Sequence, residues 1–166
     1  MIINRHPMPP GRVDVDQQPC AAMRGRIGAG SDRYAYFEHD ADIGLTGRGA
    51  TLEEAFDAAA AGMFAIMTDL AIVRCERIVK LEFEEADVEL ALVRWLNLLL
   101  AMAREHGMVF AEFRLDRDGV VWRGAATGEA WRGDHERGVE VKGATLTMLR
   151  VEQREGGWEA CCVVDV

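Results

Sequence analysis

The fold of this chain is organised around one stretch, His39-Asp40-Ala41-Asp42-Ile43-Gly44. It places an imidazole and two carboxylates within four residues, and it lies between two strand-like runs at 34–37 and 43–47. Such a polar segment between apolar runs indicates a bend at the edge of a sheet, with several oxygen atoms on one side. Hard cations such as Ca²⁺ and Mg²⁺ prefer clustered oxygen ligands. The alternative is a solvated turn in which Asp40 or Asp42 caps its own backbone.

The last residues of the sequence supply a second group of oxygen atoms. Residues 163–166 read Val-Val-Asp-Val, a strand-like run that carries Asp165 beside the α-carboxylate of Val166. If this strand lies beside the bend, Asp42, Asp165 and the Val166 carboxylate converge. Three negative groups repel one another unless a cation joins them, so this arrangement predicts a divalent-cation site.

Length and composition favour a single domain. The 166 residues are 49% hydrophobic, which is enough for one core. The formal net charge of −9 argues against autonomous binding to a polyanion, since phosphate contacts come from clustered Lys and Arg. The four cysteines lack the C-x-x-C spacing of zinc and redox sites, and no apolar run is long enough to span a membrane. These features predict a reduced, cytoplasmic protein without a membrane segment.

Local patterns predict two helices and a series of strands. Thr51 to Glu54 has the form of a helix capping box, and apolar residues then recur at helical spacing. Asp87 is the expected N-cap of a second, strongly apolar helix that ends at His106-Gly107. Apolar residues also alternate with polar ones, or run on, in segments that predict strands: 79–84, 109–115, 120–123, 139–142, 146–153 and 158–165.

These elements predict an α+β fold, a two-layer sandwich of two main helices packed on a mostly antiparallel sheet. Both faces of the last strand are largely apolar, so we expect this strand to be central and to hold Asp165 on a firm backbone. Residues 1–32 are broken by prolines and glycines and are expected to form a flexible N-terminal extension ahead of a single domain at 33–166.

The motifs together resemble archease, a family of small acidic proteins that assist the RNA-splicing ligase. The resemblance covers about 34–166 and depends on the order and spacing of short motifs. These are Phe37 to Gly44, Thr51 to Phe56, Met67-Thr68-Asp69, Trp95 to Leu99, Glu140-Val141-Lys142 and Val163 to Val166. The chain departs from the family pattern at Asp40, where a threonine is usual, and at Leu146-Thr147, where a tyrosine-histidine pair is frequent.

The resemblance implies an accessory role rather than an enzyme. Archease-like proteins promote guanylylation and turnover of a ligase that joins RNA ends carrying a 2′,3′-cyclic phosphate or 3′-phosphate to a 5′-hydroxyl, as in tRNA splicing. The RNA-splicing ligase is therefore the expected partner, and RNA is reached only through it. The resemblance implies no catalytic residue and no particular oligomeric state.

The resemblance also implies roles for individual residues. Asp42, Asp165 and Val166 match the family's metal ligands, with Ca²⁺ as the favoured ion and Mg²⁺ or Mn²⁺ as alternatives. Lys142 matches the family's functional lysine, which is expected to contact the partner or to pair with Asp165. Asp40 adds a carboxylate beside the site.

The histidines are assigned structural roles, and two other functions stay open. His39 is expected to fix the bend by hydrogen bonding, His106 to close the second helix, and His135 to lie on the surface. A small metal-dependent phosphoester hydrolase is the main alternative, with His39 as general base beside Asp42 and Asp165. A general chaperone without a specific site is the third.

Overall fold

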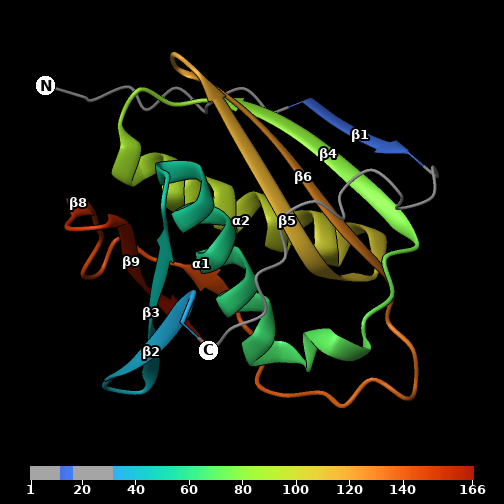
Figure 1. The fold of residues 1–166 in the computed structure, drawn as a ribbon. Helices are drawn as coiled ribbons and strands as arrows, with labels where there is room; N and C mark the ends of the chain where they lie inside the picture. Colours follow the sequence, from blue (N-terminus) through green and yellow to red (C-terminus); the bar gives the residue numbers. More distant parts are fainter. Residues whose placement is uncertain (1–11, 17–31) are drawn as a thin grey trace, which may run out of the picture.

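Two long helices form the centre of the fold in the computed structural model, which describes residues 12–16 and 32–166 (Figure 1). Helix α1 spans Leu52–Met67, and the Thr51 side chain at its N-cap accepts a hydrogen bond from the N–H of Glu54. Helix α2 spans Val88–His106, with Asp87 as N-cap. The predicted caps are confirmed, including glycine at the end of α2, where residue 107 has a φ of 60°.

The strands form two sheets, and every strand pairing is antiparallel. The first sheet has the order β1 (Arg12–Asp16), β4 (Arg77–Glu84), β6 (Val121–Ala130) and β5 (Met108–Asp118). The second has the order β2 (Tyr34–His39), β3 (Asp42–Gly49), β9 (Gly157–Asp165) and β7 (Gly143–Ala144), with β8 (Arg150–Arg154) also paired to β9. A short 3₁₀ helix, η1 (Leu70–Ile72), follows α1.

The helices lie between the two sheets and contact both of them (Figure 1). Helix α1 contacts β3 and β9 on one side and β5 on the other. One hydrophobic core therefore joins both sheets, and at its centre Phe56 of α1 stacks on Trp122 of β6 with ring centres 5.4 Å apart. The indole N–H of Trp95 in α2 donates to the carbonyl of Phe56 at 3.3 Å. The α+β class, the two main helices and the antiparallel pairing are confirmed, with the strands divided between two sheets.

The segment 139–142 is not the strand that its alternating pattern predicts. The backbone N–H groups of residues 138 and 139 donate instead to carbonyls at the end of α1. Arg104 of α2 donates to the carbonyls of Val141 and Lys142 at 2.7 and 2.8 Å. The end of α1 and the Arg104 side chain thus satisfy the backbone groups of this segment that a neighbouring strand would otherwise pair. Regular pairing begins at Gly143, and of the predicted strand 146–153 only the part from Arg150 onward forms in β8.

Within the N-terminal extension, residues 12–16 form β1, which pairs with β4 along its length. The sequence predicts no regular element there, because a single five-residue alternation is too short to stand out among prolines and glycines. The expected flexibility of residues 1–11 and 17–31 lies outside the described residues. In the described ranges, 12–16 and 32–166, neither helix combines the length and the apolar character needed to cross a membrane.

Candidate functional site

The candidate site begins at the two-residue turn between β2 and β3. His39 and Asp42 are paired at the ends of the two strands, with Asp40 and Ala41 between them. Asp40 has a φ of 49°, a left-handed conformation that aspartate adopts more readily than most residues. Because directly paired residues project from the same face of a sheet, the side chains of His39 and Asp42 lie on one face.

That face points away from α1. On β3, a Cβ atom at Gly47 would lie 2.3 Å from the carbonyl oxygen of Ala55 in α1, so Gly47 faces the helix. Successive residues of a strand alternate between faces, so Asp42 and Thr46 point the other way. The Thr46 hydroxyl contacts the Cys161 thiol of β9 at 3.2 Å on this outer face.

Strand β9 brings Asp165 and Val166 to the hairpin. It pairs with β3 up to Ile43 and Val164. The N–H of Val166 then lies 3.5 Å from Oδ1 of Asp42. The sequence separation of these two residues is 124, so the sheet alone makes them neighbours.

Lys142 reaches the same point from the opposite edge of β9. Its N–H donates to the carbonyl of Asp165 at 2.8 Å, and its Nζ donates to a main-chain oxygen of Val166 at 3.1 Å. The structure therefore brings Asp42, Asp165, Val166 and Lys142 together. Asp40 lies exposed on the adjacent turn.

The hydrogen bond that the sequence predicts for His39 is not made by its Nδ1. Within the described residues, this buried nitrogen has no hydrogen-bond partner. The β2–β3 ladder and the left-handed backbone of Asp40 shape the bend instead. A buried polar atom without a partner costs about 1–3 kcal/mol. This nitrogen, on the same face as Asp42, favours a ligand at the site.

The donor set suits a hard cation only if main-chain oxygen is included. Among the described residues, no three His, Cys, Asp or Glu side chains are placed to hold a metal ion. Asp42 and Asp165 are the candidate carboxylate ligands, and Val166 is the candidate third oxygen source. Because Nζ of Lys142 contacts Val166, a cation at that oxygen competes with the lysine.

A turn with two exposed apolar side chains flanks the site. The N–H of Thr145 donates to the carbonyl of Val163, and the N–H of Val163 donates to the carbonyl of Thr147, two residues before Asp165. In the same turn Leu146 is 63% exposed and Met148 is 57% exposed. Met148 has a φ of 52°, an unusual conformation for this residue type. The sequence predicts a strand over 146–153, and its local pattern does not mark this turn.

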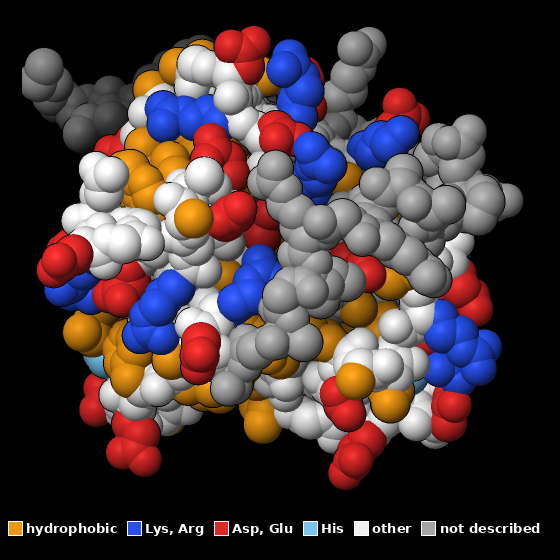
Figure 2. All heavy atoms as spheres, in the orientation of Figure 1, with side chains coloured by type: hydrophobic (Ala, Val, Ile, Leu, Met, Phe, Trp, Pro, Cys, Tyr) orange, Lys and Arg blue, Asp and Glu red, His pale blue; other side chains and the backbone are white. Residues whose placement is uncertain are grey.

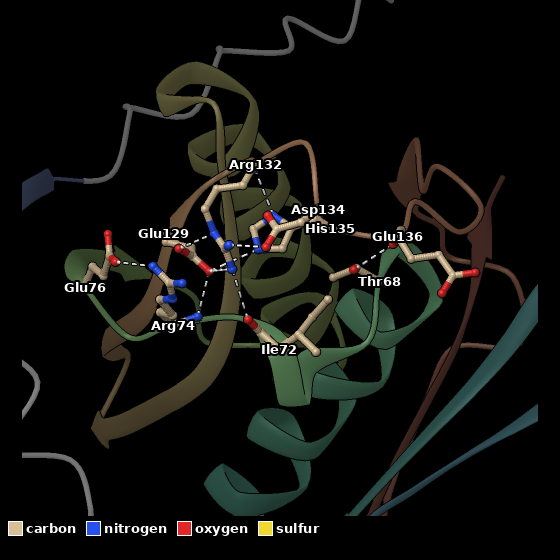
Figure 3. Close-up of polar contacts among 9 residues, drawn as sticks. All are labelled: Thr68, Ile72, Arg74, Glu76, Glu129, Arg132, Asp134, His135 and Glu136. Atoms are coloured by element: carbon tan, nitrogen blue, oxygen red, sulfur yellow. Dashed lines mark hydrogen bonds and ion pairs between the residues drawn. The ribbon is translucent and has the colours of Figure 1, made fainter.

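A second polar cluster, which no motif in the sequence marks, lies around Glu129 (Figure 3). His135 is buried, contrary to the predicted surface position, with Nε2 3.0 Å from Oε1 of Glu129. Arg132 donates to both Glu129 oxygens at 2.9 and 3.0 Å, and the N–H of Arg74 donates at 2.8 Å. Burial raises the pKa of Glu129, but these hydrogen bonds outweigh burial and lower the pKa to about 2. Glu129 is therefore a buried, fully paired carboxylate.

Comparison with known proteins identifies the family. Residues 34–166 match the archease protein family (MTH1598/TM1083). The chain belongs to the archease family. It is 34% identical over 137 residues to the protein archease of Sulfolobus acidocaldarius, covering 81% of this chain and 99% of the relative. It is 37% identical over 140 residues to the protein archease of Thermococcus gammatolerans, with the same coverage.

A solved archease-like structure has the same fold. The solution structure of Methanobacterium thermoautotrophicum protein 1598 superposes with a TM-score of 0.70 at 29% identity. The match covers 81% of this chain and 99% of that protein. Archease family membership thus applies to the part of the chain that holds both sheets and both helices, apart from β1.

Proposed function

We propose that this protein is a cytoplasmic accessory protein of an RNA-splicing ligase and that it promotes the guanylylation and turnover of that ligase in tRNA splicing. Membership of the archease family supports an RNA-ligase accessory role in general terms. The observation that carries the finer proposal is the meeting of Asp42, Asp165, Val166 and Lys142 at one end of the second sheet.

In this proposal, Asp42, Asp165 and the carboxylate of Val166 hold a divalent cation. Ca²⁺ is the favoured ion because all three donors are hard oxygens, and Mg²⁺ and Mn²⁺ are the alternatives. A bound cation offsets the mutual repulsion of the three carboxylates. Lys142 orients Val166 through its Nζ contact and is displaced from that oxygen toward the partner when a cation enters.

The surface supports a protein partner rather than direct binding of RNA. The net charge is −9, and side chains of both signs are interspersed over the face shown in Figure 2. Binding of a polyanion needs clustered Lys and Arg instead. Leu146 and Met148 are exposed in the turn beside the acidic site and offer apolar contacts to a protein partner. RNA is then reached through the ligase.

The test is RNA joining and guanylylation by a purified RNA-splicing ligase, with and without this protein. We expect the wild type to accelerate both, and Asp42→Asn and Asp165→Asn to lose at least about tenfold of the acceleration. Asp118→Asn is the matched control, since Asp118 is an exposed aspartate at the tip of the β5–β6 hairpin in the other sheet. All three variants should keep the wild-type circular dichroism and Tm.

Two outcomes would contradict the proposal. One is no acceleration of a ligase that is competent by itself. The other is full acceleration by both site variants, which would remove the site from the function while leaving the family role intact.

One observation favours a second candidate function. The Nδ1 of His39 has no partner among the described residues and lies on the face of Asp42, which makes it a candidate general base for a small metal-dependent phosphoester hydrolase. Hydrolysis of p-nitrophenyl phosphate by the protein alone with Mn²⁺, abolished by His39→Ala, would support that function. Absence of turnover would leave the accessory role.

A further inference from the structure

A cavity of about 500 Å³ opens between the ends of both helices and the segment 131–141. Its apolar floor includes Met67 of α1, Leu100 of α2 and Met108 of β5, and the Trp131 side chain forms one wall. This volume lies in the range of pockets that bind small organic molecules, about 300–1,000 Å³. The cavity is separate from the site at the β2–β3 hairpin, and none of the proposed metal ligands lines it.

The mouth of the cavity carries unpaired positive charge. The guanidinium of Arg137 lies 4.1 Å from the centre of the Trp131 ring, and within the part of the chain that the structure describes it forms no ion pair. Arg104 donates to the neutral backbone carbonyls of residues 141 and 142. Among the described residues that line the cavity, Glu140 is the one acidic residue. In a protein with a net charge of −9, this local excess of arginine is complementary to an anion.

The loop that carries Trp131 and Arg137 is held in place by the Glu129 cluster (Figure 3). Arg132 and His135 both bond to the buried Glu129 carboxylate. The Trp131 ring packs edge-on against the His135 ring, with centres 5.6 Å apart. A buried charge that is fully hydrogen-bonded resists displacement, because any shift leaves it unpaired. The aromatic wall is therefore preorganised.

The loop is also fastened to α1. The Thr68 hydroxyl donates to the carbonyl of Glu136 at 2.8 Å, one residue before Arg137. The N–H of Gly138 donates to the carbonyl of Met67 at 2.8 Å on the other side of Arg137. These bonds fix the backbone on both sides of the arginine, whose exposed side chain lies over the Trp131 ring.

We propose that this cavity binds a flat aromatic ligand that carries a phosphate or carboxylate group. The ring packs against Trp131 over the apolar floor, where offset stacking adds about 0.5–1.5 kcal/mol to area burial. The anionic group accepts hydrogen bonds from Arg137, whose planar fork matches a carboxylate or phosphate. A cationic ligand is disfavoured by Arg104 and Arg137.

The test is titration calorimetry on the full chain with two classes of probe. Guanosine and adenosine 5′-monophosphate represent aromatic phosphates, and indole-3-acetate represents aromatic carboxylates. The nucleosides without phosphate, and inorganic phosphate alone, separate the contributions of ring and anion. We expect at least one ring-plus-anion probe to bind saturably and at least about tenfold more tightly than either component.

Variants locate the binding. Arg137→Met keeps the apolar stem and removes the charge, and Trp131→Leu removes the stacking surface; each should weaken binding at least about tenfold. Arg117→Met is the matched control, because Arg117 also stacks on a tryptophan, at 4.8 Å from the Trp122 ring, but does not line the cavity. It should bind as the wild type does. Failure of every probe to saturate, or unchanged binding by Arg137→Met, would overturn the proposal. The measurement needs no ligase, so its result is independent of the accessory function.

Discussion

Replacing Glu129 with glutamine preserves the shape of the side chain and removes its charge. In the folded protein, burial raises the pKa of Glu129, but hydrogen bonds from Arg132, the Arg74 N–H and His135 outweigh it and lower the pKa from 4.5 to about 2. A pKa lowered by about 2.5 corresponds to roughly 3 kcal/mol of folding free energy at neutral pH. We therefore expect Glu129→Gln to lose about 3 kcal/mol, and Tm to fall by roughly 6–12 °C for a chain of this size.

The pKa shift of Glu129 also predicts how the stability difference between wild type and variant changes with pH. The folded-state pKa of Glu129 lies below its unfolded value, so the stabilisation is complete above about pH 4.5 and is lost as the pH falls through about 2. Glutamine does not titrate, so the gap in unfolding free energy between wild type and variant should shrink to less than about half at pH 3.

Urea unfolding followed by circular dichroism between pH 7 and pH 3 measures this gap. Glu136→Gln is the control, because Glu136 lies in the same loop with its side chain exposed, and its backbone carbonyl rather than its carboxylate accepts the hydrogen bond from Thr68. The control should match the wild type at every pH. Equal stability of Glu129→Gln and wild type at pH 7, or a gap of the same size at pH 7 and pH 3, would refute the reasoning.

Three further perturbations test other parts of the molecule. A Cβ at Gly44 would lie 2.1 Å from the Phe37 ring, so Gly44→Ala should lower the unfolding free energy by about 1–3 kcal/mol; unchanged thermal unfolding would contradict this. Burial raises the pKa of Asp57 to about 8, so the unfolding free energy of the wild type falls as the pH rises from about 4 through 8. At pH 9, Asp57→Asn should therefore have an unfolding free energy at least about 1 kcal/mol higher than the wild type in urea unfolding. At pH 4 the variant should show no such gain. A Gly-Ser pair added after Val166 replaces its carboxylate with a peptide carbonyl and should weaken Ca²⁺ or Mn²⁺ binding at least about tenfold by calorimetry with Tm unchanged; undiminished affinity would exclude the Val166 carboxylate as a ligand.

The helices were predictable because their signals are local. Thr51, Asp87 and Gly107 stand at the helix ends, and each acts on backbone groups within one turn. The division of the strands into two sheets has no such signal. It depends on which faces pack against α1 and α2, and alternation along a strand says only that one face is buried.

The candidate site was predictable in its residues but not in its geometry. Asp42 and Asp165 stand out as carboxylates at the ends of strand-like runs, and the family resemblance pairs them with Val166 and Lys142. Their approach requires β3 to pair with β9 in one register, and nothing in either segment alone specifies that partner. The resemblance therefore carried information that local physics lacked.

The errors share one physical cause, which is that tertiary contacts override local patterns. The segment 139–142 alternates like a strand, but the end of α1 and Arg104 take its backbone groups. His135 lies in a polar loop that reads as solvated, yet Glu129 six residues earlier draws it into the interior. The residues next to the segment 139–142 do not indicate its contact with Arg104, and the residues next to His135 do not indicate its contact with Glu129.

The central position of β9 affects how slowly the backbone at the candidate site exchanges its amide hydrogens. The strand has β3 along one edge and β7 and β8 along the other, so amide hydrogens on both edges are held in ladders. Such hydrogens exchange with solvent only when the whole cooperative unit opens, whereas those of exposed loops exchange by local fluctuation. Residues 158–164 therefore belong to the slowest-exchanging class of backbone, whereas Asp165 lies beyond the last pair with β3 and is held on the β7 edge by Gly143.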